Sequence, residues 1–86
     1  MVFQEVEIVN PTGLHTRPGK QFVQEAKKYP CEISIKKGDT EANAKSLLKL
    51  LKIGVSQGDR ITITCDGEQE AEALASLCTF VAQLSE

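Results

Sequence analysis

Alternating apolar and polar positions mark three stretches of the chain as strands: residues 3–9, 32–37 and 60–65. Apolar side chains alternate with polar ones in them, namely Val6 and Ile8, Ile33 and Ile35, and Ile61, Ile63 and Cys65. A period of two with one polar face is typical of antiparallel strands that are covered on one side only. The turn sequence KKGDT at residues 36–40 predicts a hairpin, so we expect a fourth, short strand over residues 40–42.

Helical periodicity fills the gaps between these strands. Residues 18–28 and 69–84 have apolar residues at helical spacing: Phe22, Val23 and Ala26 in the first, and Ala71, Leu74, Leu77, Cys78, Val81 and Leu84 in the second. A shorter helix is expected from Ser46 to Ile53, ended by Gly54. The predicted order β-α-β-β-α-β-α indicates an α+β open-faced β-sandwich, with three helices on one face of a four-stranded antiparallel sheet.

Length and composition limit what this protein does. With 86 residues, the chain is expected to form one domain, residues 1–86. A formal net charge of −2 excludes the strong basicity of a nucleic-acid-binding domain. No apolar run reaches about 18 residues, and the first ten residues lack the basic and apolar blocks of a signal peptide, so we expect a cytoplasmic monomer without membrane insertion. The three cysteines form no C-x-x-C unit and predict no metal site; no cofactor is expected.

The chemistry of this chain centres on TGLHTRPGKQF, residues 12–22, which contains its single histidine. Thr16 or Arg17 is the expected N-cap of the helix that follows, and Pro18 suits its first turn. His15 then stands beside backbone N–H groups that have no intrahelical partner, where the helix dipole attracts anions and favours the neutral imidazole. A neutral ring nitrogen can attack phosphorus, and Arg17 can donate to the phosphoryl oxygens.

Other histidine chemistries fit this stretch less well. No serine or cysteine elbow accompanies His15, as hydrolysis by a catalytic triad requires, and partner ligands for a metal are absent from the pattern. There is no phosphate-binding loop of the Walker type, so the chain has no evident means of binding ATP. Reversible phosphoryl storage on His15, with another protein as donor, is the predicted chemistry.

The motif GLHTRP resembles the active-site signature of HPr, the histidine-containing phosphocarrier family of the bacterial phosphoenolpyruvate-dependent sugar phosphotransferase system. The resemblance extends over QFVQEAKKY, AKSLLKL and GVSQGDRITITCDGEQE, and so over the whole chain. It implies that Nδ1 of His15 accepts phosphate from Enzyme I and passes it to IIA domains of sugar permeases. Thr16, Arg17 and Pro18 are the accompanying site residues. Such a protein is a component of a phosphotransferase rather than a stand-alone catalyst.

The leucine-rich helix, AKSLLKLLKIG, has more apolar surface than a helix on a sheet needs. Leu47, Leu48, Leu50, Leu51 and Ile53 cover an arc of roughly 220°, whereas a stripe of about 100° suffices. The helix is therefore either wedged deeply between neighbours or exposes an apolar patch for partners. The resemblance favours the patch, formed by Leu47, Leu48 and Leu51. It also implies a basic rim, for which the candidates are Arg17, Lys20, Lys27, Lys45, Lys49 and Lys52.

Ser46 has two interpretations. It is a good N-cap for the leucine-rich helix. In some HPr proteins the matching serine is phosphorylated by a dedicated kinase, which would place negative charge in the docking patch. The sequence KSLLKLL is more similar to versions from bacteria without serine control, so a serine kinase and phosphatase remain an open alternative as partners.

The chain departs from the family pattern directly after the motif, where Gly19 and Lys20 replace two small residues, often alanines. Gly19 costs up to about 1 kcal/mol of helix propensity relative to Ala, and Lys20 adds a cation near the phosphoryl site. Two alternatives stay open. One is a nitrogen-branch phosphotransferase paralogue with the same His15 chemistry. The other is a regulatory module that is not phosphorylated and binds partners through Leu47, Leu48 and Leu51.

Overall fold

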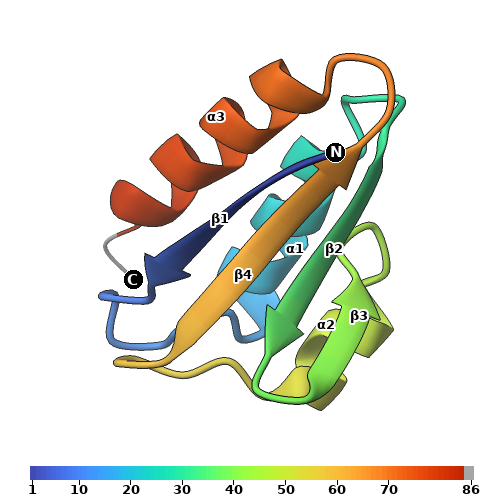
Figure 1. Ribbon diagram of the computed structural model, residues 1–86. Coiled ribbons are helices and arrows are strands. Elements are labelled where there is room, and N and C mark those ends of the chain that lie inside the picture. Colours follow the sequence, from blue (N-terminus) through green and yellow to red (C-terminus); the bar gives the residue numbers. More distant parts are fainter. Residues whose placement is uncertain (85–86) are drawn as a thin grey trace.

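The computed structural model describes residues 1–84, and its elements follow the predicted order. They are β1 (Val2–Glu7), α1 (Thr16–Ala26), β2 (Glu32–Lys37), β3 (Thr40–Asn43), α2 (Leu47–Ile53), β4 (Arg60–Asp66) and α3 (Glu70–Ala82). The strands form one antiparallel sheet in the order β1-β4-β2-β3, and the three helices lie on one face of it (Figure 1). The predicted open-faced β-sandwich is confirmed.

The apolar face of each strand meets the helices, as the alternation predicts. In the sheet register Ile61 is opposite Val6, and Ile63 is opposite Ile35. Ile35 and Ile63 are fully buried, and they join a core to which α1 contributes Phe22. The Phe22 ring lies edge-on to that of Phe80, with centroids 5.9 Å apart, and links α1 to α3.

The buried stripe of α3 differs from the predicted one at its start. Ala71 was expected on the apolar face but is exposed, and Ala73 is fully buried in its place. The buried positions of α3 are Ala73, Leu77 and Val81, a spacing of four residues. Residues 71 and 73 are both alanines and so have the same size and hydropathy. The sequence pattern therefore could not decide which of them faces the sheet.

All three cysteines are free thiols. Cys31 and Cys65 are buried in the core, whereas Cys78 is partly buried and packs against it. Burial raises the pKa of the Cys65 thiol to about 11, and the neighbouring Cys31 adds to this effect. The Cys65 thiol is therefore protonated at neutral pH.

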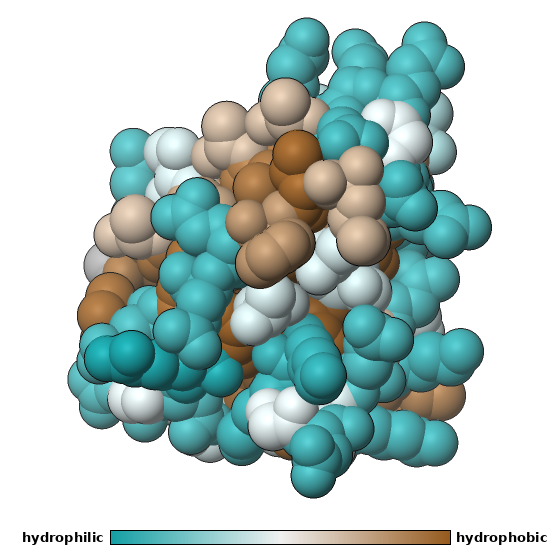
Figure 2. Space-filling view, in the orientation of Figure 1, coloured by the Kyte–Doolittle hydropathy of each residue, from teal (hydrophilic) through white to brown (hydrophobic). Residues whose placement is uncertain are grey.

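The other face of the sheet is uncovered in residues 1–84. Figure 2 shows this side to be mostly hydrophilic, with apolar side chains gathered in its upper part. Met1 and Phe3 are exposed large hydrophobic residues of this end of β1. Among the described residues, none of the helices has the length and apolar character needed to cross a membrane.

Candidate phosphorylation site at the start of helix α1

His15 is presented by residues 8–14, here named the His15 loop, which packs closely against residues 54–59, the α2–β4 loop. Gly13 has a φ of +61°, and a Cβ at this position would lie 2.3 Å from the carbonyl oxygen of Val55. Only glycine allows this close approach. Asn10 is buried, and its Nδ2 donates to the carbonyl of Gly13 at 2.8 Å. The loop before the histidine is therefore held in one conformation.

The N-cap of α1 is His15 itself, one residue earlier than the predicted Thr16 or Arg17. The reason is the backbone: the N–H of Gly19 donates to the His15 carbonyl at 2.6 Å and closes the first helical turn. The His15 side chain makes no capping hydrogen bond, and the residue is exposed. The imidazole is thus directed to solvent at the mouth of the helix.

The first turn of α1 provides an environment that suits an anion. Thr16 and Arg17 are exposed, and Pro18 is buried with no N–H to satisfy. The first helical turn carries no acidic side chain. Backbone N–H groups at such a helix start have no intrahelical acceptors, and the positive end of the dipole acts at the same place. The structure brings the four motif residues, His15 to Pro18, together at one helix end.

Helix α2 separates its leucines between core and solvent. Leu50 is fully buried, whereas Leu48 is 68% exposed. Leu47 and Leu51 are half-buried beside it, and we name Leu47, Leu48 and Leu51 the leucine patch. The exposed apolar patch, and not the deep wedge, is therefore the correct alternative.

The two ends of α2 are closed as the sequence predicted. The N-cap is Ser46, whose Oγ accepts a hydrogen bond from the N–H of Lys49 at 3.4 Å. The C-cap is Gly54 in the left-handed conformation, with φ 71° and ψ 57°. The capping role accounts for the presence of Ser46 at this position.

Gly19 joins the His15 loop to the leucine patch. A Cβ on Gly19 would lie 3.0 Å from the Leu14 carbonyl oxygen and 3.5 Å from Cδ1 of Leu47. The missing side chain therefore lets α1 approach both the residue before His15 and the first leucine of α2. Sequence reasoning assigned this glycine only a cost in helix propensity; the contact that it permits is visible only in three dimensions.

The predicted basic rim is smaller than expected. Lys45 is not part of this rim, because its Nζ donates to the carbonyls of Tyr29 at 2.6 Å and Cys31 at 2.8 Å. Lys27 is the C-cap of α1, roughly 16 Å along the axis from its first turn. The exposed cations that remain near the site are Arg17 and Lys20 of α1 and Lys49 and Lys52 of α2.

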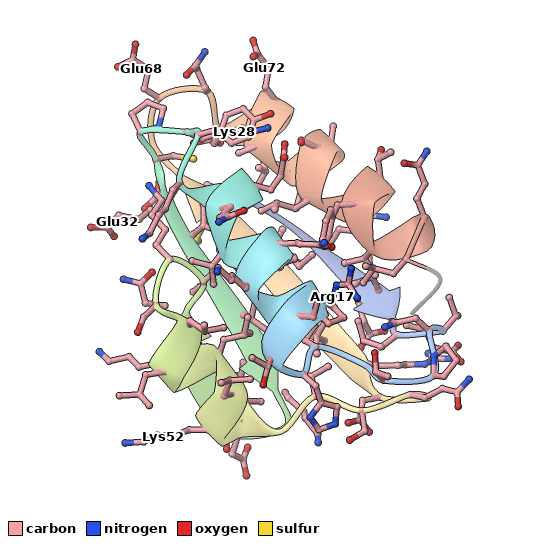
Figure 3. The ribbon with its side chains drawn as sticks, turned by 180° about the vertical axis from the view of Figure 1, so that it is seen from behind. Arg17, Lys28, Glu32, Lys52, Glu68 and Glu72 are labelled. Carbon is pink, nitrogen blue, oxygen red and sulfur yellow. The ribbon has the colours of Figure 1, made fainter. Side chains whose placement is uncertain are left out.

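Figure 3 labels charged side chains at both ends of the molecule. Arg17 and Lys52 lie at the end where α1 begins and α2 ends (Figure 3). Glu68 and Glu72 lie at the opposite end, around the start of α3 (Figure 3). Lys28 lies at this second end as well (Figure 3), so the labelled charges there are of both signs. Within residues 1–84, no cluster of three or more His, Cys, Asp or Glu side chains could hold a metal ion.

A family model described as the PTS HPr component phosphorylation site matches residues 2–83. The chain belongs to the HPr family. Phosphocarrier protein HPr of Haemophilus influenzae is 44% identical over 84 residues, which cover 98% of this chain and 99% of that protein. The HPr-like protein Crh of Bacillus subtilis is 41% identical and covers 94% of this chain and 95% of its own length. The resemblance inferred from the motif is confirmed.

Solved structures of the family agree with the fold. HPr of Thermoanaerobacter tengcongensis superimposes with a TM-score of 0.93 at 38% identity, covering 95% of this chain and 92% of that one. Other structures of HPr and Crh are described as dimers. The expectation that this HPr-family chain is a monomer therefore stays a prediction.

Proposed function

We propose that this protein is a phosphoryl carrier of the sugar phosphotransferase system, and that His15 accepts phosphate from phosphorylated Enzyme I and passes it to IIA domains. The observation that carries the proposal is the single, exposed histidine at the N-cap of α1, with Arg17 in the same turn. Membership of the HPr family over residues 2–83 adds independent support.

The chemistry follows from this position. The lone pair of Nδ1 forms a new bond to phosphorus while the bond from phosphorus to the donor breaks, and the donor leaves with that electron pair. The helix start and the Arg17 guanidinium stabilise the negative oxygens of the phosphoryl group. A dipole contribution of about 0.3–1 kcal/mol per anion favours the phosphorylated form and still allows onward transfer.

Docking in this proposal uses the leucine patch and its cations, Lys20 and Lys49 among them. Leu48 has most of its side chain in solvent and would become buried against a partner. Nearby cations would speed the encounter with an acidic partner surface. The patch and His15 are joined through the contact of α1 with Leu47 at Gly19.

The test is intact-mass spectrometry at neutral or alkaline pH after mixing the protein with Enzyme I, magnesium and phosphoenolpyruvate. We expect one added phosphoryl group that is lost in acid and is absent in His15→Ala. Parallel reactions with sugar-branch and nitrogen-branch Enzyme I distinguish the two branches. No adduct with either enzyme would refute the carrier function.

A regulatory binding module is the second candidate, because relatives named HPr-like protein Crh are nearly as similar as those named HPr. A solved structure of one of them is described as a catabolite repression protein. Such a module would bind its partner through the leucine patch without phosphorylation of His15. The absence of an adduct in the experiment above, together with partner binding that survives His15→Ala, would favour it.

A further inference from the structure

The His15 loop takes its position from the α2–β4 loop. The N–H of Leu14, the residue before His15, donates to the carbonyl of Val55 at 3.1 Å. At the other end of the loop, the N–H of Ile8 donates to the carbonyl of Asp59 at 2.8 Å. Because both ends of the His15 loop are bonded to the α2–β4 loop, a movement of the latter changes the position of the imidazole.

The α2–β4 loop is itself held by an ion pair between Lys37 and Asp59. Lys37 is the last residue of β2, and its Nζ lies 2.8 Å from Oδ2 of Asp59 and donates to the carbonyl of Gly54 at 2.9 Å. The same Oδ2 accepts the backbone N–H of Ser56 at 2.8 Å. Side-chain exposures of 34% for Lys37 and 28% for Asp59 place the pair partly out of solvent.

The electrostatics favour a charged pair at neutral pH. Hydrogen bonds from Lys37 and from the backbone of Ser56 hold the pKa of Asp59 below its usual value of 3.8. The ammonium group also faces the carbonyl of Gly54, the C-cap of α2, where a cation is favourable. One side chain therefore binds both the end of the helix that carries the leucine patch and the loop on which His15 rests.

We propose that Lys37 and Asp59 are positioning residues for phosphoryl transfer, which fix the His15 loop relative to the leucine patch. The proposal rests on the proposed carrier function of His15. Neither side chain has to touch phosphate in this role. They act through Gly54, Ser56 and the backbone bond from Leu14 to Val55, so that donor and imidazole meet in a reactive orientation when a partner binds the patch.

The experiment compares Lys37→Met with Lys36→Met. Both variants remove one positive charge from consecutive residues of β2, but Lys36 is exposed on the open face of the sheet. The change in net charge is therefore matched. In steady-state phosphotransfer with Enzyme I and phosphoenolpyruvate, we expect Lys37→Met to lower kcat about fivefold, which corresponds to about 1 kcal/mol of activation free energy. The KM for the carrier should stay within twofold, and Lys36→Met should match the wild type.

Amide hydrogen exchange supplies a readout that needs no phosphorylation. We expect the N–H groups of Leu14 and Ile8 to exchange faster in Lys37→Met than in the wild type, while that of Ile63 in the central strand β4 is unchanged. Unchanged exchange at Leu14 would overturn the proposal. Faster exchange with an unaltered kcat would overturn it as well. Lys37 would then hold the His15 loop, but this contact would have no effect on phosphoryl transfer.

Two further measurements keep the proposal testable in every case. Asp59→Asn retains an acceptor for Ser56 but removes the ion pair, and it replaces Lys37→Met if that variant does not fold; Lys37→Arg should recover part of kcat. If the wild type itself is not phosphorylated, the carrier function fails separately, and amide exchange at Leu14 decides whether Lys37 holds the His15 loop. Faster exchange in Lys37→Met than in Lys36→Met supports this role, and equal exchange in the two variants refutes it.

Discussion

Replacing Leu48 by alanine separates docking from folding, because the structure places this side chain mainly in solvent. Leu48 is 68% exposed, so about a third of it is buried in the free protein. Full burial of a leucine is worth about 1.5–3 kcal/mol, so the variant should lose about 0.5–1 kcal/mol of unfolding free energy. Leu50→Ala, in the same helix but fully buried, should lose about 2–5 kcal/mol.

The effect of Leu48→Ala on transfer should exceed its effect on stability. If a partner covers the exposed two thirds of Leu48, the complex loses about 1–2 kcal/mol, which raises KM about 5–30-fold. Phe3→Ala is the matched control, since Phe3 is also 68% exposed but lies on β1. KM is measured from initial rates of phosphotransfer from Enzyme I, and stability from urea unfolding. An equal KM for wild type and Leu48→Ala would remove Leu48 from the docking surface.

Three other predictions test the structure around the site and the core. Gly13→Ala should lose clearly more free energy of unfolding in urea than Gly38→Ala, although both glycines have φ near +60°. A Cβ on Gly13 would overlap the Val55 carbonyl, whereas a Cβ on Gly38 would meet nothing within 4 Å. Equal losses would disprove the close approach. Hydrogen bonds, chiefly from Ser76 and to a smaller extent from Lys28, lower the pKa of Glu25 in the folded protein. Its contribution to the free energy of unfolding is therefore complete above 4.5, the pKa of the unfolded chain, and is lost as pH falls through the lowered folded pKa. The decline of stability between pH 5 and pH 3 (roughly the range of carboxyl titration) should accordingly be shallower in Glu25→Gln than in Glu72→Gln, and identical slopes would contradict it. Cys65 has a pKa of about 11 and a buried side chain, so it should react with a thiol reagent at pH 8 only when the core opens, and more slowly than Cys78. A fast phase of the reaction that survives Cys78→Ala would refute this burial.

The elements of the fold were predictable because the burial of each residue follows the local period of the chain. Alternation in β2 and β4 identified Ile33, Ile35, Ile61 and Ile63 as inward, and all four are buried. Boundaries were less certain. The N-cap was expected at Thr16 or Arg17, because Pro18 suits the first turn of a helix, yet the carbonyl of His15 closes that turn. Ala71 and Ala73 were equally apolar, so only packing could choose between them.

The position of the candidate site was also predictable, because it depends on residue types in sequence order: one histidine, an arginine two residues later and a proline after that. The apolar excess of α2 likewise predicted an exposed patch, and Leu48 bears it out. Lys45 was misplaced for a different reason. A lysine next to the N-cap of an amphipathic helix is expected in solvent, and nothing in its neighbourhood indicates that it binds the carbonyls of Tyr29 and Cys31, 16 and 14 residues away.

The contacts that hold the His15 loop could not be predicted, because most of them end on backbone carbonyls. Every residue carries a carbonyl, so the bond from Lys37 to Gly54, 17 residues away, leaves no trace in residue types. The same holds for the bond from Leu14 to Val55. Gly19 even reads as a defect until the Leu14 carbonyl and Leu47 are placed around it. A motif therefore predicts which group reacts, whereas the loop that carries this group is held by contacts that only the folded chain brings together.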